Sequence, residues 1–110
     1  MPRPATTVIA DGFPIGPWVP NSSASRWIAP VEADADANAA PGDYVYRTTF
    51  TLSGLNPASV AVSGTWAADN TARIVLNGVD TGVAISSPEQ FGTLASFALS
   101  RGFVAGVNTL

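Results

Sequence analysis

Short runs of apolar residues alternate with polar residues along much of the chain, and Gly, Pro and Asn separate the runs. Alternation at every second residue is typical of β-strands that bury one face. The strongest run covers residues 44–52, and a second covers residues 58–66. The face of the first run that we expect to meet the core consists of Tyr44, Tyr46, Thr48, Phe50 and Leu52. The corresponding face of the second run consists of Val60, Val62, Gly64 and Trp66.

The turn residues between the runs predict how some of them are connected. Asn77 and Gly78 separate the runs 73–76 and 79–83, and Asn-Gly accepts the positive φ that a two-residue type I′ turn requires. We therefore predict a β-hairpin here. Further strands are expected over residues 6–10, 93–99 and 107–110, and a surface loop over 31–43. One helical turn is expected over 86–91, with Ser87 as its cap and Pro88 at its first position.

These elements predict an all-β chain that forms a single antiparallel β-sandwich domain over residues 1–110. A chain of 11.3 kDa buries about 65% of its surface on folding, which is enough for one core. The last run, residues 107–110, is short for a strand that pairs along a sheet. We therefore expect a sandwich that lacks its last strand, in a chain truncated at the C-terminus. Such an open sheet edge favours self-association through edge strands.

The composition removes much of the usual catalytic chemistry. The chain has no His and no Cys, and 12% of its residues are charged. His is the usual general base near neutral pH, and structural zinc sites need Cys or His. Glycoside hydrolysis needs a pair of carboxylates, but Glu32 and Glu89 lie in the predicted loop and helical turn and are not placed to face each other. We predict a protein that is not an enzyme and has no cofactor.

The charge distribution argues against nucleic acid as a partner. The net charge is -3, and the five cations are single arginines at positions 3, 26, 47, 73 and 101. No basic stripe is present to displace counterions from phosphates. No run approaches 18 apolar residues, so we expect no membrane span in this chain. Residues 1–7 also lack the apolar core of a signal peptide.

Two tryptophans are candidates for ligand contact. Trp18 and Trp27 lie in irregular segments near prolines, where an indole ring is more easily exposed for stacking on a sugar. The alternative is that each closes one end of the sandwich, because large aromatic side chains usually pack in cores. Trp66 shares its face with Val60 and Val62, so core packing is the prediction there.

Four polar residues on predicted turns are the other ligand candidates. Asp69, Asn70, Asn77 and Asp80 offer side-chain oxygens to a polar ligand. Their alternative role is turn chemistry, because Asp and Asn side chains bond to nearby backbone groups and Asn accepts left-handed φ.

The segment 34–38 resembles the start of a calcium loop, with oxygen ligands on alternate residues. The match fails further on, because Ala39 stands where the loop needs Gly and Val45 where it needs a bidentate Glu. We interpret the segment as a solvated acidic loop and predict no metal ligands.

Several stretches, taken in order, resemble a bacterial module. They are residues 18–21, 26–30, 44–52, 54–57, 66–70, 74–78 and 103–110. Together they resemble the β-sandwich regions of exported proteins that carry a C-terminal PEP-CTERM type sorting signal. The tyrosine-rich run, the Leu-Asn-Gly hairpin and the Gly-x-Asn-x-Leu ending are also similar to the galactose-binding-like jelly rolls that accompany glycosidases.

The resemblance implies a jelly-roll, galactose-binding-like fold and an extracellular or cell-surface location. It implies a noncatalytic domain of an exported bacterial protein that serves adhesion, surface-matrix or carbohydrate binding, with carbohydrate or extracellular matrix as partner. It further implies a signal peptide before Met1 and a strand and a sorting helix after Leu110. A second hypothesis is a structural accessory domain that packs beside a catalytic domain, such as a glycosidase, and binds no ligand itself.

Overall fold

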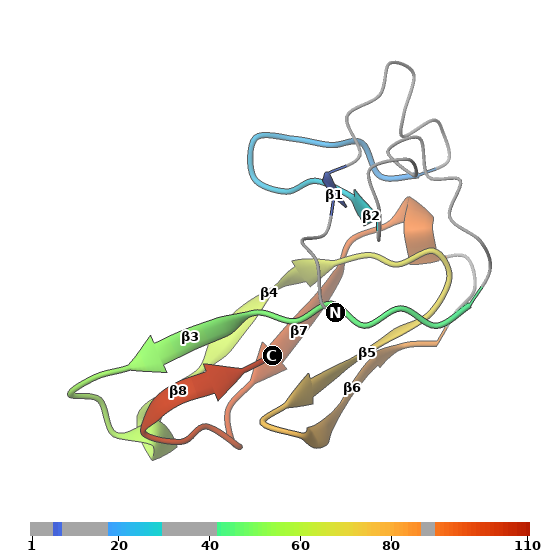
Figure 1. The fold of residues 1–110 in the computed structure, drawn as a ribbon. Helices are drawn as coiled ribbons and strands as arrows, with labels where there is room; N and C mark the ends of the chain where they lie inside the picture. The colour runs from blue at the N-terminus through green and yellow to red at the C-terminus, as the bar shows by residue number, and fades with distance from the viewer. Residues whose placement is uncertain (1–5, 8–17, 30–41, 87–89) are drawn as a thin grey trace. The chain divides into compact units, whose positions relative to one another are not determined.

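A computed structural model describes residues 6–7, 18–29, 42–86 and 90–110 (Figure 1). The chain divides into two compact units, Met1–Tyr46 and Arg47–Leu110. Each unit is described by itself. A single sandwich domain over the whole chain stays a prediction.

In the first unit, the described residues include a short antiparallel strand pair. Strand β1 (Thr6–Thr7) pairs with β2 (Ile28–Ala29). The start of the predicted strand 6–10 is therefore confirmed, and residues 8–10 lie outside the described part. Before β2, the Ser22 hydroxyl oxygen accepts hydrogen bonds from the backbone N–H groups of Ala24 and Ser25, which is a turn held by a short polar side chain.

The described residues of the second unit form three antiparallel strand pairs and two 3₁₀ turns. Strand β3 pairs with β8, β4 with β7, and β5 with β6 (Figure 1). The strands are β3 (Thr49–Leu52), β4 (Val62–Trp66), β5 (Ala72–Leu76), β6 (Val79–Ile85), β7 (Ala95–Leu99) and β8 (Gly106–Thr109). The 3₁₀ turns are η2 (Pro57–Ser59) and η3 (Gln90–Gly92).

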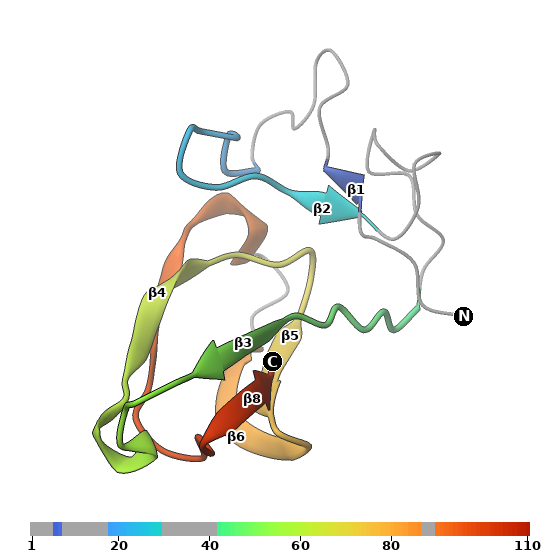
Figure 2. The same cartoon turned by 60° about the vertical axis from the view of Figure 1, so that its left-hand side comes forward.

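Apolar side chains from all three strand pairs meet in one core. Its buried members are Ile74, Leu76, Leu99 and Phe103. The half-buried side chains around them are Phe50, Leu52, Val60, Val62, Trp66, Val83, Phe97 and Leu110. The core packing predicted for Val60, Val62 and Trp66 is therefore confirmed. Figure 2 shows the strands of this unit from a second direction.

Two edge-to-face ring contacts lie at this core. Phe50 and Phe103 have ring centroids 6.1 Å apart, and Trp66 and Phe97 have centroids 5.9 Å apart. Beside the second contact, a Cβ added to Gly64 would lie 3.1 Å from the Phe97 ring. A side chain larger than that of glycine at position 64 would therefore press against the Phe97 ring.

The predicted strand 44–52 is shorter in the structure. Strand β3 begins at Thr49. One further pair of residues extends its ladder with β8, because Thr48 and Leu110 exchange two backbone hydrogen bonds of 2.8 Å. Phe50 and Leu52 contact the core as predicted. The prediction is wrong for Tyr44 and Tyr46, which are 45% and 42% exposed, and for Thr48, which is also exposed. The alternation in the sequence continues up to and beyond the Thr48–Leu110 rung, where the ladder with β8 ends.

An all-β chain with antiparallel strand pairs is confirmed. The helical turn predicted over 86–91 is observed at its end as η3, and residues 87–89 lie outside the described part. The sandwich, the jelly-roll arrangement and the missing last strand remain predictions.

Candidate functional site

The β5–β6 hairpin forms at the predicted Asn-Gly turn. Asn77 has φ 51° and Gly78 has φ 80°, as a type I′ turn requires. Leu76 and Val79 are paired on either side of the turn. The predicted β-hairpin is therefore confirmed.

Strand β6 contains a bulge that the sequence analysis did not predict. The pairing shifts between Arg73, opposite Ala84, and Val75, opposite Asp80, so β6 has extra residues where β5 has Ile74. Gly82 lies inside this stretch with φ 80°, a conformation that glycine adopts without strain. An isolated Gly within a strand pattern is the sequence signal that could have predicted the bulge.

Side chains of the bulge satisfy its own backbone. The Thr81 hydroxyl donates to the Ile74 carbonyl at 2.7 Å and accepts from the Val83 N–H at 3.2 Å. Asp80 Oδ1 accepts from the Gly82 N–H at 2.9 Å. The N–H groups of Gly82 and Val83 are thus bonded to side chains of β6 itself. This stretch is therefore poorly suited to pair with a further strand.

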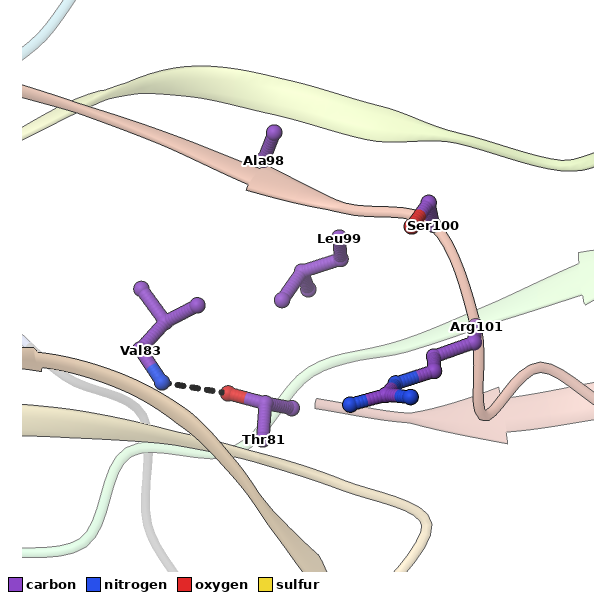
Figure 3. A pocket seen from close by; sticks show the side chains of 6 residues that line it. All are labelled: Thr81, Val83, Ala98, Leu99, Ser100 and Arg101. Carbon is purple, nitrogen blue, oxygen red and sulfur yellow. Dashed lines mark hydrogen bonds between the residues drawn. The ribbon is translucent and has the colours of Figure 1, made fainter.

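A hollow of about 310 Å³ lies beside this bulge. Thr81 and Val83 of β6 line one side, and the end of β7 with the residues after it, Ala98 to Arg101, lines the other. Figure 3 shows the Leu99 and Val83 side chains directed into the space between the strands, with the Arg101 side chain extending toward Thr81. Because Leu99 is itself buried in the core, the accessible lining of the hollow is mostly polar and includes a cation and hydroxyl groups.

Arg101 is the chemically distinctive residue of the hollow. It is exposed, and no ion pair joins it to any carboxylate of the described residues. A guanidinium stays charged at every relevant pH and matches a carboxylate with two parallel hydrogen bonds. Ser100 beside it adds a hydroxyl group. This arrangement suits a small anionic ligand.

The hollow could not be predicted from the sequence. Its two walls come from β6 and from the end of β7, which are separated in the chain by η3. No motif marks Ser100 and Arg101, and a single arginine before a glycine is too common to indicate a site. Only the arrangement of the two strands brings these residues together.

Asn77, a predicted ligand residue, lies in a hydrogen-bond network with β8. Its Nδ2 donates to the Gly102 carbonyl at 3.0 Å and to Asn108 Oδ1 at 2.9 Å. Its Oδ1 accepts from the Thr109 N–H at 2.9 Å, and its own N–H donates to the Thr109 carbonyl at 2.8 Å. Of the turn chemistry that was the alternative to ligand contact, the left-handed φ of Asn77 is observed. The side-chain bonds instead reach residues 25 to 32 positions later and fasten the hairpin to β8 and the segment before it.

Asn108 is the buried partner in this network, with 0% exposure. Its Oδ1 also accepts from the Val104 N–H at 2.8 Å. Its Nδ2 donates to the carbonyls of Val104 and Gly106 at 2.8 and 3.1 Å. Every polar atom of this side chain is hydrogen-bonded, which is the condition under which a buried amide is tolerated.

The other predicted polar residues lie on exposed turns. Asp80 pairs with Arg73 at 3.4 Å in addition to its bond with Gly82. Asp69 and Asn70 lie in the exposed connection between β4 and β5. Asn77 and Asp80 share one hairpin, but neither lines the hollow. Ligand contact by these residues stays a prediction.

The two predicted tryptophans lie in the first unit. Trp18 and Trp27 are both half-buried. The Trp27 indole N–H donates to the Val19 carbonyl at 2.7 Å, and its backbone N–H donates to Asn21 Oδ1 at 2.8 Å. These bonds fix the indole within its own segment, and ligand contact by the two tryptophans stays a prediction.

Neither a metal site nor a membrane helix is found in the part of the chain that the structure describes. Within that part, no three His, Cys, Asp or Glu side chains are grouped so that they could hold a metal ion. The calcium-like segment 34–38 lies outside it. Among the same residues, no helix has the length and apolarity to cross a membrane.

No known protein family, no curated protein and no solved structure matches the chain. The observations support a small, mostly-β protein with antiparallel strand pairs and identify no family.

Proposed function

We propose that the chain is a noncatalytic binding domain of an exported bacterial protein, located outside the cell or on its surface. Its role would be adhesion, surface-matrix or carbohydrate binding, as the sequence resemblance implies. The observation that carries the binding proposal is the hollow beside the β6 bulge, with the exposed Arg101 at its polar end and Val83 and Leu99 directed into it.

The size and lining of the hollow favour one class of ligand. A volume of about 310 Å³ is at the lower end of ligand pockets, which span roughly 300–1,000 Å³. It suits one sugar-sized group rather than a long polymer. Because the polar end carries a guanidinium, a saccharide with a carboxylate is the ligand we expect to bind best.

A glycan array with neutral and uronic-acid saccharides tests this proposal. We expect Arg101→Gln to weaken binding of the acidic saccharides by about tenfold or more, since a hydrogen bond to a charged group contributes about 1.5–3 kcal/mol. Arg47→Gln is the matched control, because Arg47 is also exposed and in the same unit and loses the same charge. The binding proposal fails if the folded chain, checked by circular dichroism, retains no glycan.

A structural accessory domain is the second candidate. It is favoured by apolar side chains that the second unit leaves exposed, including Val107 at 62%, Val79 at 68% and Leu55 at 58%. Such side chains would be covered if a catalytic domain packed against this unit. Binding to a neighbouring domain of the same gene product, together with an empty glycan array, would favour this function over ligand binding.

A further inference from the structure

The Asn77–Gly78 dipeptide forms the hairpin turn, and it also has a chemical reactivity that the turn does not require. Asparagine is a thermolabile residue, and its side-chain amide is attacked most easily by the backbone nitrogen of a following glycine, which has no Cβ to hinder the approach. Gly78 is exposed at the end of the hairpin, so water reaches the turn. Chemical reactivity and solvent access thus coincide at this position.

The folded state opposes the reaction by holding the Asn77 side chain. Nδ2 is bonded to Gly102 and Asn108, and Oδ1 is bonded to Thr109. Each of these partners lies in β8 or in the segment before it. Attack by Gly78 N on Asn77 Cγ needs a side chain that is free to turn toward this nitrogen, and these bonds restrain it. The rate of reaction therefore depends on how often β8 separates from the turn.

We propose that Asn77 is a deamidation site that the fold protects and that reacts when β8 separates from the hairpin turn. The Gly78 backbone nitrogen gives its proton to solvent and forms a bond to Asn77 Cγ. The Cγ–Nδ2 bond breaks, and Nδ2 leaves as ammonia after taking up a proton. Water then opens the resulting cyclic imide, giving aspartate or isoaspartate at position 77. The net change is the exchange of an amide for a carboxylate at the expense of one water molecule, with no oxidation or reduction.

The product cannot restore the original network. In place of Nδ2, a carboxylate oxygen would face two acceptors, the Gly102 carbonyl and Asn108 Oδ1. Acceptors that face each other in a partly buried place repel and leave each other without a donor. An isoaspartate would in addition lengthen the main chain within a two-residue turn. The attachment of the hairpin turn to β8 would therefore be weaker once the reaction has occurred.

Peptide mapping by mass spectrometry tests the protection directly in the unmodified chain. The full chain is incubated in mildly alkaline buffer with and without urea, and deamidation is followed at each asparagine. We expect Asn77 to react at least about tenfold more slowly in the native chain than in urea, because reaction requires local opening. We also expect Asn70, which precedes Thr71 and not a glycine, to react more slowly than Asn77 in urea. Equal rates at Asn77 in the two conditions, or no excess over Asn70 in urea, would overturn the proposal.

A pair of Asn→Asp variants tests the consequence. Asn77→Asp imitates one product and replaces a side-chain donor, so we expect a lower thermal midpoint or a failure to fold. Asn56→Asp is the control, because Asn56 uses only its Oδ1, which accepts from the Ala58 N–H at 3.0 Å, and aspartate preserves this bond. Equal midpoints for Asn77→Asp and the unsubstituted chain would refute the claim that deamidation weakens the attachment of the turn to β8.

Discussion

Replacing Asn108 with alanine tests how much the buried amide contributes to the second unit. The substitution leaves the Val104 N–H and the carbonyls of Val104 and Gly106 without their side-chain partner, and it removes one of the two acceptors of Asn77 Nδ2. An unsatisfied buried group costs about 1–3 kcal/mol. Val104 and Gly106 are not fully buried, so water recovers part of that cost. We expect a loss of about 2–4 kcal/mol in the free energy of unfolding, against a usual total of about 5–15 kcal/mol.

Thermal and urea unfolding, followed by circular dichroism, measure this loss. The midpoint temperature should fall by roughly 10–25 °C, and the urea midpoint should fall with an unchanged m-value. Asn56→Ala is the control, since Asn56 is exposed and caps η2 through one hydrogen bond, and loss of a cap costs about 1 kcal/mol. If Asn108→Ala costs no more than Asn56→Ala, the network is not a main source of stability and the reasoning is refuted.

Two further substitutions test local packing and the bulge. Gly64→Ala places a Cβ 3.1 Å from the Phe97 ring, so the ring has to move, and we expect a loss of about 1–3 kcal/mol in chemical unfolding; an unchanged midpoint would mean that the ring shifts freely. Thr81→Val keeps the side-chain shape but removes a hydroxyl that makes two hydrogen bonds in the bulge. Here we expect a loss of about 1–3 kcal/mol and faster amide hydrogen exchange at Val83, whereas unchanged exchange would show that the hydroxyl does not hold the bulge.

Features that depend on adjacent residues could be predicted from the sequence. The Asn77–Gly78 hairpin is one example, because its turn geometry is a property of two neighbouring residues. The inward side chains of 58–66 are another, because alternation in a short run already separates the two faces of a strand. Both are confirmed by the hairpin pairing and by the core.

Features that depend on a distant partner could not be predicted in this way. The sequence alternates from Tyr44 onward, but the ladder of β3 with β8 starts only at the Thr48–Leu110 rung. Asn108 looks like an ordinary polar residue in a short run, and its burial depends on Asn77, which lies 31 residues earlier. Arg101 could not be identified as a site residue from the sequence for the same reason. The hollow that it lines forms only between β6 and the end of β7.

The pairing of β3 with β8 has a consequence for the synthesis of the chain. Thr49 lies opposite Thr109, sixty residues later, so β3 has no β8 to pair with until nearly the whole described chain has been made. At about 5–20 residues per second, the wait is roughly 3–12 s. During that time Phe50 and Leu52, which later contact the core, belong to a strand without a partner. The nascent chain therefore passes through an interval in which it is exposed to aggregation or chaperone capture, and the length of that interval is set by the speed of the ribosome.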